Sequence, residues 1–369
     1  MESCDVLIVG GGPAGSTCAW KLGRSGFDVL VIDAATFPRD KLCAGWITPP
    51  VLAELELSPD DYGRGRTLQP ITGFRTALIG GRQLETRYAS PMSYGIRRCE
   101  FDTYLLARSG ARLKLGTRVA TIGRADGRWI VNEDVRARML VGAGGHFCPV
   151  ARLVNPEGRQ EPVVATREIE FRMDERQAAK CAVAPDTPEL YFCRDLRGYG
   201  WCFRKQDYLN VGFGRLGSRG VPAEAEAFAD FLKSRGRIPA DTPTRWRGHA
   251  YLLYPTAPRA VAGDGVLLVG DAAGLAYPES GEGIRPAVES GRLAADTIVA
   301  ARGEYSFENL GRYRERLEAR FGRRASTDAA STLLPSAVRM WMASRLLATR
   351  WFTRRFVIER WFLHAHDRT

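Results

Sequence analysis

The sequence predicts an α/β protein, α+β overall, in which a domain of alternating strands and helices carries an inserted antiparallel sheet and precedes a C-terminal helical segment. Three observations predict this fold. A glycine-rich turn joins an apolar run to a helix-forming stretch near the N-terminus, a second apolar run ends at Gly270-Asp271, and short strand-like runs fill residues 161–255.

The composition is that of a folded protein with a strong basic excess. At 369 residues the chain exceeds one domain of about 150 residues, and its 45% hydrophobic and 26% charged residues exclude a disordered or collagen-like chain. The formal net charge is +11, of which +7 falls in residues 301–369, where 14 arginines outnumber 7 acidic residues. Such an excess favours an anionic partner.

Three further features of the sequence limit the class of protein and its location in the cell. No two of the eight cysteines form a C-x-x-C pair and the four histidines are scattered, so no metal site is indicated. The N-terminus lacks the pattern of a signal or transit peptide, and no uncharged apolar stretch reaches about 20 residues. We expect a cytoplasmic protein with reduced thiols, with attachment to a membrane surface left open.

The first strand, turn and helix read as a dinucleotide site. An apolar run leads into G-x-G-x-x-G at Gly10, Gly12 and Gly15, and a helix-forming stretch and a second apolar run ending in Asp33 follow. Gly10 permits the tight turn, Gly12 admits a pyrophosphate to the backbone, and Gly15 lets the helix pack on its strand. A turn with only a packing role is the alternative. The predicted contacts are Gly10, Gly12, Pro13, Ala14, Gly15 and Asp33, which would hold the ribose.

A second signal, far along the chain, separates FAD from NAD. The apolar run 265–270 ends in Asp271, and two glycines precede a helix predicted from about 285 to 301. A carboxylate at this place suits a ribityl hydroxyl, and free N–H groups at the helix start suit the pyrimidine side of a flavin. Asp271 as a simple helix cap is the alternative. The predicted contacts here are Gly270, Asp271, Gly281, Gly283 and Ile284.

Two further segments resemble known flavoprotein motifs. Residues 141–152 are similar to Gly-Ala-Asp-Gly-x-x-Ser-x-Val-Arg, with Gly144 and Cys148 as departures, and residues 96–106 are similar to Arg-x-x-Phe-Asp-x-x-Leu. Together with the glycine-rich segments, they resemble the para-hydroxybenzoate hydroxylase-like FAD fold over residues 1 to about 300. The resemblance implies a Rossmann-type FAD-binding domain, with Arg98 as a flavin or ribityl contact and Val119 as a further cofactor contact.

Two stretches resemble the geranylgeranyl reductase family within that superfamily. Residues 37–46 are similar to the loop Phe-Pro-Arg-x-Lys-x-Cys-Gly-Gly, and residues 199–214 are similar to Tyr-x-Trp-x-Phe-Pro followed by Gly-x-Gly, with Arg204 in place of proline. The resemblance implies that Cys43 lies by the isoalloxazine ring, where its thiol would protonate an alkene carbon as reduced flavin delivers hydride. A packing role for Cys43 is the alternative. Cofactor contacts are also expected at Arg39, Lys41 and Ala44, which replaces the first loop glycine.

The aromatic residues of the second stretch alternate along one strand. Tyr199, Trp201 and Phe203 share a face, where they either line a hydrophobic substrate cavity, with Tyr199 and Trp201 as catalytic residues beside Cys43, or form ordinary core. The domain boundaries we expect are residues 1–70, 95–160 and 256–301 for FAD binding, 71–94 and 161–255 for the antiparallel substrate domain, and 302–369 for the C-terminal helical region.

These segments predict an FAD-dependent oxidoreductase that reduces carbon–carbon double bonds of a prenyl or similarly hydrophobic substrate. An aromatic monooxygenase, which shares the FAD motifs, is the alternative. A tryptophan-type halogenase is disfavoured because no lysine lies between Lys41 and Lys114. We expect the reductant to be transiently bound NAD(P)H or another external donor.

The C-terminal region contains two patterns. Residues 309–324 mix Glu and Arg at helical pairing distances, which favours a solvated helix. From Met340 onward, aromatic groups such as Trp351-Phe352 and Trp361-Phe362 alternate with arginines. This mixture suits a helical cap on the substrate cavity or a peripheral contact with an anionic membrane. Nucleic acid is not expected, since no nucleic-acid-binding motif accompanies it, and the oligomeric state is left open.

Overall fold

The chain folds into two compact units. The computed structural model describes residues 1–157, 161–257, 259–324 and 336–365. Unit 1 comprises Met1–Lys41, Arg98–Pro162 and Tyr251–Asp328, and unit 2 comprises Leu42–Arg97, Val163–Ala250 and Ala329–Thr369. The segment after Lys41, which the sequence assigned to the first domain, therefore falls with the inserted sheet. The reason is Trp46, whose ring lies 5.5 and 5.6 Å, between centroids, from Phe74 and Phe203.

Unit 1 is built on a mainly parallel sheet. Its strands are β1 (Glu2–Val9), β2 (Val29–Asp33), β8 (Arg112–Leu115), β9 (Ile122–Ala125), β10 (Arg128–Val131), β11 (Val135–Gly142), β17 (Ala262–Gly263) and β18 (Val266–Leu268). The order is β17-β18-β11-β1-β2-β8, and every ladder from β18 to β8 is parallel. Val6, Leu7 and Ile8 of β1 are fully buried, as expected for a parallel strand covered on both faces.

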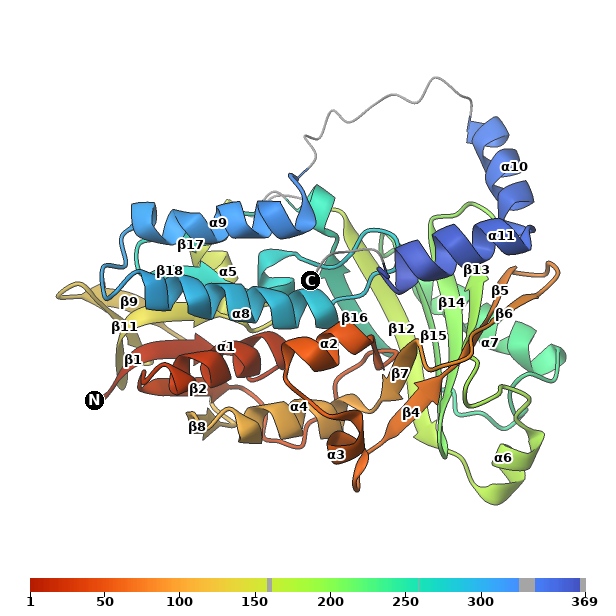
Figure 1. Cartoon of the computed structure of the whole chain (residues 1–369), viewed down its shortest axis with the longest axis horizontal. Helices are drawn as coiled ribbons and strands as arrows, with labels where there is room; N and C mark the ends of the chain where they lie inside the picture. The colour runs from red at the N-terminus through yellow and green to blue at the C-terminus, as the bar shows by residue number, and fades with distance from the viewer. Residues whose placement is uncertain (158–160, 258, 325–335, 366–369) are drawn as a thin grey trace. The chain divides into compact units, whose positions relative to one another are not determined.

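Three helices of unit 1 lie next to one another in Figure 1: α1 (Pro13–Arg24), α8 (Ile284–Ala300) and α9 (Phe307–Phe321). Gly291 allows α8 to approach α1, since a Cβ at this position would lie 2.4 Å from the carbonyl oxygen of Ala14. α9 buries Leu310, Tyr313 and Leu317 at helical spacing, as an amphipathic helix does. The remaining helical segments are α4 (Arg98–Arg108), α5 (Pro149–Val154), η1 (Tyr254–Thr256) and η2 (Gly270–Ala273).

Unit 2 contains the inserted sheet, in the order β16-β12-β15-β14-β13-β5-β6. The strands are β5 (Gly73–Leu78), β6 (Leu84–Arg87), β12 (Val163–Arg172), β13 (Glu189–Phe192), β14 (Gly198–Lys205), β15 (Tyr208–Leu216) and β16 (Arg247–Leu252). The ladders among β12, β15, β14 and β13 are antiparallel, as expected, but β13 runs parallel to β5. These two strands lie far apart in the chain, so no hairpin fixes their relative direction.

The two faces of this sheet bury different residues. On one face, α7 (Val221–Ser234) packs against residues that include Cys202 and Phe213. Tyr199, Trp201 and Phe203 lie on the other face, as their alternation predicts. The shorter elements of unit 2 are α2 (Pro49–Glu54), α3 (Pro59–Gly63), α6 (Glu175–Lys180) and a small sheet of β3 (Trp46–Ile47), β4 (Leu68–Ile71) and β7 (Ser93–Ile96).

The C-terminal segment covers the aromatic face of the sheet. It forms α10 (Ser336–Leu347), α11 (Arg350–Phe352) and a π-helix, Thr353–Phe362 (Figure 1). The buried ring of Phe362 stacks on Trp46 with centroids 5.4 Å apart, and Tyr199 meets it edge-on at 5.4 Å. The tail is therefore a helical cap on this face. The side chain of Met340 and residues 325–335 and 366–369 lie outside the described residues.

No helix within the described ranges has both the length and the apolar character needed to span a bilayer.

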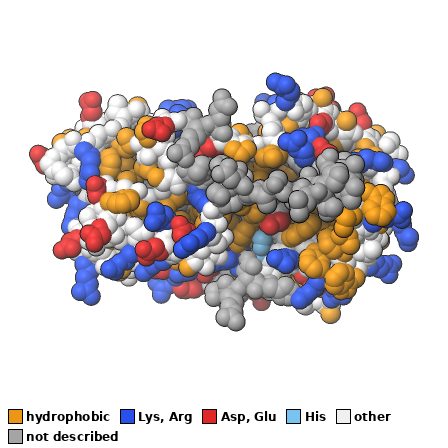
Figure 2. All heavy atoms as spheres, turned by 90° about the horizontal axis from the view of Figure 1, so that it is seen from above, with side chains coloured by type: hydrophobic (Ala, Val, Ile, Leu, Met, Phe, Trp, Pro, Cys, Tyr) orange, Lys and Arg blue, Asp and Glu red, His pale blue; other side chains and the backbone are white. Residues whose placement is uncertain are grey.

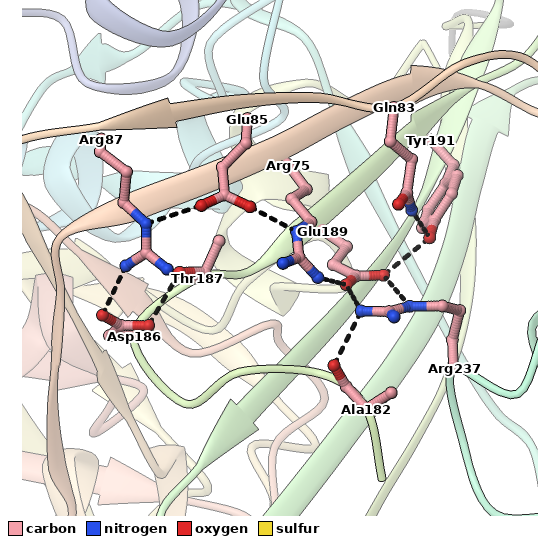
Figure 3. Close-up of polar contacts among 10 residues, drawn as sticks. All are labelled: Arg75, Gln83, Glu85, Arg87, Ala182, Asp186, Thr187, Glu189, Tyr191 and Arg237. Atoms are coloured by element: carbon pink, nitrogen blue, oxygen red, sulfur yellow. Dashed lines mark hydrogen bonds and ion pairs between the residues drawn. The ribbon is translucent and has the colours of Figure 1, made fainter.

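A buried carboxylate ties strand β13, in the interior of the sheet, to neighbouring loops (Figure 3). Glu189 on β13 is fully buried, and its oxygens accept hydrogen bonds from the Tyr191 hydroxyl at 2.7 Å and from Nε and Nη2 of Arg237. Arg75 on β5 is a longer partner, with Nη1 at 3.4 Å. Nη2 of Arg237 also donates to the carbonyl oxygen of Ala182 at 2.8 Å. Arg237 thus links the segment after α7 to β13 and to the segment after α6.

We expect Arg237→Ala to destabilise the protein by about 3 kcal/mol, because it leaves the buried Glu189 carboxylate without its main counter-ion. The matched control is Arg87→Ala in the same group of residues. Arg87 is about half exposed and pairs with Glu85 and Asp186 at the surface, so its loss costs about 1 kcal/mol or less. The measurement is the midpoint of urea unfolding. Equal shifts for the two variants would show that Glu189 does not depend on Arg237.

Candidate functional site

The glycine-rich turn has the close contacts that the sequence predicts. Gly10 has φ +115°, and a Cβ there would lie 2.4 Å from the carbonyl oxygen of Ala143. A Cβ on Gly15 would lie 1.9 Å from the carbonyl oxygen of Gly10. Both positions therefore require glycine. The turn also touches the third motif, because Ala143 belongs to the segment that resembles a flavoprotein motif.

The start of α1 is open to a ligand. Its N-cap is Gly12, Pro13 occupies the first helical position, and no side chain caps the helix by a hydrogen bond. A Cβ on Gly12 would meet only Nη2 of Arg39 within 4 Å among the described residues, at 3.3 Å. The backbone N–H groups of Ala14 and Gly15 have no partner within a regular helix, and the helix dipole adds positive potential. This cradle fits a pyrophosphate.

Asp33 closes the turn at the end of β2. Its Oδ2 accepts the N–H of Gly11 at 2.8 Å, and its Oδ1 accepts the N–H of Ala35 at 2.8 Å. These two bonds fix the carboxylate beside the turn. Each oxygen keeps a second lone pair, which leaves the carboxylate able to accept a ribose hydroxyl as predicted.

Two arginines share one buried acid beside the turn. Nε and Nη2 of Arg98 donate a bidentate pair of hydrogen bonds to Asp102, both at 2.8 Å. Nη2 of Arg39 lies 3.0 Å from the same carboxylate. The three groups together carry one positive charge, and Arg39 reaches Gly12. The arrangement suits a diphosphate at the start of α1. We did not predict a role for Asp102 from the sequence, although it stands in the motif that contains Arg98.

The second glycine-rich segment packs between the start of α1 and α8, because a Cβ on Gly270 would contact Ala14 and Ala287. A Cβ on Gly270 would lie 3.1 Å from Cβ of Ala14, so η2 is against the start of α1. Oδ1 of Asp271 lies 3.2 Å from the place of a Cβ on Gly283, the N-cap of α8. Asp271 is itself the N-cap residue of neither helix, since those are Val269 and Gly283. Its carboxylate is therefore held at the start of α8, where a ribityl hydroxyl was expected.

The residues around this segment include a carboxyl that the sequence did not single out. Both oxygens of Glu282, between Gly281 and Gly283, are buried without a hydrogen-bond partner among the described residues. Burial raises the pKa of Glu282 to about 8, although the charge of Arg285 acts in the opposite direction. Ile284 is the buried first residue of α8, and Val119 packs against the core of unit 1.

Unit 2 holds the second group of predicted residues. Cys43 is half-buried on the loop before β3, and its N–H donates to Oε1 of Glu168 at 2.5 Å. Its carbonyl oxygen accepts Nδ2 of Asn210 at 3.3 Å. Ala44 packs at the margin of the aromatic cluster, and Lys41 is the half-buried last residue of the first segment of unit 1. The loop around Cys43 is therefore bound to the sheet through its backbone.

A buried polar network lies under this loop. Nζ of Lys205, on β14, is 2.5 Å from Oε2 of Glu170 and donates to the carbonyl oxygen of Ile96 at 3.0 Å. Nδ2 of Asn210 donates to the same oxygen of Glu170 at 3.1 Å. Nε1 of Trp201 donates to Oδ1 of Asn210 at 2.8 Å. The network connects the Cys43 loop to the indole of Trp201.

Sequence reasoning missed the charged members of this network. The available signal was the alternation of Glu168 and Glu170 with Ile169 and Phe171 along a strand-like run, and Lys205, between Arg204 and Gln206, showed no such pattern. Burial raises the pKa of Glu168 to about 7, while the charge of Lys205 and the N–H of Cys43 lower it. Glu168 is therefore a titratable group with a shifted pKa that contacts the backbone of the predicted catalytic cysteine directly.

The aromatic residues form an apolar face beside the network. The indole of Trp201 lies over Gly212, where a Cβ would come within 2.1 Å of its ring. Tyr199 lies 5.7 Å from Trp201 between ring centroids and remains half-buried. In the described residues both rings pack in one cluster with the C-terminal cap. This face can hold an apolar chain only where the cap leaves room or moves.

Comparisons with known proteins agree with these features. A family model described as an NAD(P)-binding Rossmann-like domain matches residues 8–39. The chain is 32% identical to a menaquinone reductase of Mycobacterium tuberculosis, over 80% of this chain and 77% of that protein. It is also 32% identical to digeranylgeranylglycerophospholipid reductase 1 of Methanopyrus kandleri, over 86% of each.

A solved structure shares the fold. A geranylgeranyl bacteriochlorophyll reductase-like protein from Thermoplasma acidophilum matches with a TM-score of 0.74 and 23% identity, over 95% of this chain and 88% of that chain. The nucleotide-binding α/β domain and the inserted sheet are thus both part of a known architecture.

Proposed function

The chain belongs to the geranylgeranyl reductase family of FAD-dependent oxidoreductases, and we propose that it adds two hydrogens across carbon–carbon double bonds of an isoprenoid chain. The observation that carries the substrate class is the similarity to two reductases over most of the chain, one of them named for a geranylgeranyl lipid. The apolar face of Tyr199, Trp201 and Phe203 supports it, since a polyene chain offers few polar groups to bind.

The residues of unit 1 would hold the cofactor. The start of α1 with Arg39 would bind the pyrophosphate, Asp33 the ribose, and Asp271 with the start of α8 the ribityl and pyrimidine side. When bound and reduced by the external donor, FAD would supply a hydride for one alkene carbon. The electron donor we propose is NAD(P)H or another external reductant that binds transiently, because the second G-x-G-x-x-G, at Gly212, Gly214 and Gly217, runs along strand β15 and does not form a turn from a strand into a helix.

The chain itself would supply the proton. The Cys43 thiol would give its proton to the second alkene carbon, so that the double bond becomes a single bond and the thiolate regains a proton from water. The backbone contacts of Cys43 with Glu168 and Asn210 would keep the loop in place during this step. The aromatic face would orient the chain and exclude water from it.

The proposal is tested by reoxidation of chemically reduced holoenzyme without oxygen. A lipid with a geranylgeranyl chain should restore the absorbance of oxidised flavin, and the fully saturated lipid should not. A phenol that is hydroxylated only in air, with oxygen uptake, would instead indicate the aromatic monooxygenase.

We also propose that the C-terminal cap meets an anionic lipid surface. Its exposed apolar residues are Trp341, Met342, Leu346 and Trp351, at 60%, 44%, 40% and 68% exposure. Arginines stand among them, and the guanidinium of Arg345 lies 5.6 Å from the ring of Trp341. Figure 2 shows hydrophobic and basic side chains together at the end of the molecule that carries α10 and α11. Aromatic and arginine side chains together suit a headgroup region.

We expect the full chain to sediment with vesicles that contain anionic phospholipid, and less so at high salt. Replacing Trp341 and Trp351 by serine should weaken this binding by about tenfold or more, because two exposed indoles no longer enter the interface. The control is Phe307→Ser on α9, which removes another ring that is 58% exposed. Equal binding by all three proteins would contradict the proposed surface.

A further inference from the structure

Glu168 occupies the junction between the Cys43 loop and the sheet. It lies on β12, directly opposite Gly212 of β15, and is 3% exposed. Because Gly212 has no side chain, the space above it is filled by the indole of Trp201, which lies next to Glu168 in register. Among the described residues, its carboxylate accepts a hydrogen bond from the N–H of Cys43. A buried carboxylate thus directs one oxygen at the backbone of the predicted catalytic cysteine.

The charges around Glu168 come from three strands. Glu170 lies on the same strand, Lys205 on β14 and Arg247 on β16. Lys205 is paired with Glu170 at 2.5 Å, and Nε of Arg97, at the end of β7, lies 3.9 Å from the other oxygen of Glu170. The nearest ammonium group is therefore already bound to another carboxylate. The charges of Lys205 and Arg247 offset the buried negative charge of Glu168 from a distance, and the N–H of Cys43 offsets it by a direct hydrogen bond.

We propose that Glu168 is a positioning residue for Cys43: its ionised carboxylate holds the backbone of the cysteine, and this hold weakens when the carboxyl is protonated. The inference rests on the proposed role of Cys43 as proton donor to the alkene. Glu168 does not touch the reacting atoms in this account. It acts by fixing the loop from which the thiol is presented.

The sign of the pH effect follows from linkage. Burial raises the pKa of Glu168 to about 7, whereas the N–H of Cys43 lowers it. A group that lowers the pKa binds the ionised form more tightly than the neutral form, so ionisation must in turn strengthen the bond to Cys43. The hold on the loop is therefore strongest above about pH 7 and is lost as the pH falls through this value.

Hydrogen exchange of the full-length holoenzyme tests the proposal without substrate. Peptides that cover residues 42–48 report the Cys43 amide, and rates are corrected for the intrinsic effect of pH. We expect the protection factor to rise by about fivefold from pH 6 to pH 8, the size that charge assistance adds to a hydrogen bond. In Glu168→Gln, which keeps the shape and an acceptor oxygen, we expect no change over this range. A flat profile in the wild-type protein would overturn the proposal whether or not the variant folds.

Glu170→Gln is the matched control in the same network. It removes a neighbouring charge that raises the pKa of Glu168, so the pH-dependent protection should persist with its midpoint at lower pH. Loss of the pH dependence in both variants would assign the effect to the network as a whole and overturn the specific role of Glu168.

Kinetics provide the functional readout. With an active substrate, kcat of the wild-type enzyme should rise with pH near 7 and that of Glu168→Gln should not, with KM unchanged within about twofold. An identical kcat profile would overturn the positioning role even if the exchange result holds. If no isoprenoid is reduced at all, the proposed function fails while the exchange experiment still decides the contact.

Discussion

Gly12→Val abolishes FAD binding without unfolding the chain. Gly12 has φ −75° and ψ −175°, a conformation open to any L-residue, and a Cβ there meets only the end of the Arg39 side chain within 4 Å among the described residues. The apo protein can therefore accept the valine. The branched side chain occupies the space at the start of α1 where the pyrophosphate must approach the backbone.

The expected rise in the dissociation constant of FAD is at least about a hundredfold, because two or more charge-assisted hydrogen bonds worth about 1.5–3 kcal/mol each are lost. Binding is measured by quenching of flavin fluorescence in the apo protein, and folding by circular dichroism. Gly123→Val is the control: Gly123 lies exposed on β9, with open space around its Cβ. Tight FAD binding by Gly12→Val would contradict the site, as would an equal loss in the control.

Cys43→Ala lowers turnover by about a hundredfold to a thousandfold and leaves FAD bound, since a general acid contributes factors of this size. Water in the same place would give the residual rate. Cys43 belongs to unit 2. Its hydrogen bonds to Glu168 and Asn210 are made by its backbone N–H and carbonyl groups, which alanine keeps. The fold of the loop should therefore survive.

The control for this variant is Cys181→Ala, a second half-buried thiol of unit 2 at the end of α6. Its turnover should match that of the wild-type protein. The measurement is single-turnover saturation of the substrate by reduced enzyme, with bound flavin determined on the same samples. Unchanged turnover of Cys43→Ala with retained FAD would remove the thiol from the mechanism.

The parts of the site that sequence could predict are those set by local backbone requirements. A side chain at position 10 or 15 would collide with neighbouring backbone atoms, so both positions require glycine. A short sequence motif is therefore enough to predict them. Likewise, alternation alone places Tyr199 and Trp201 on one face of β14. Local pattern is enough where local geometry decides.

The remaining residues depend on contacts between distant segments. Asp102 acquires its role because Arg39 arrives from another part of the chain, and Glu168 because the Cys43 loop lies over β12. A charged residue in a strand pattern reads as a solvated position unless its partners are known. The parallel pairing of β5 with β13 escaped prediction for the same reason.

The basic C-terminal region, residues 301–369, was predicted correctly in one part and incompletely in another. A helix at 309–324 was predicted with a solvated Glu and Arg surface, and Arg314 does pair with Glu318 at 3.8 Å on the exposed side. Arg320 instead reaches the buried Glu289 of α8 at 2.9 Å. Part of the positive charge is therefore used inside unit 1, and composition alone could not separate the two uses.

The most direct test of the account is the mass of a lipid incubated with the enzyme. Under anaerobic conditions, with a chemical reductant and FAD-loaded protein, a geranylgeranyl-bearing lipid should gain two hydrogens for each double bond reduced, and Gly12→Val should leave it unchanged. An unchanged lipid with wild-type enzyme, together with a phenol that gains one oxygen atom in air, would contradict the account and indicate a monooxygenase.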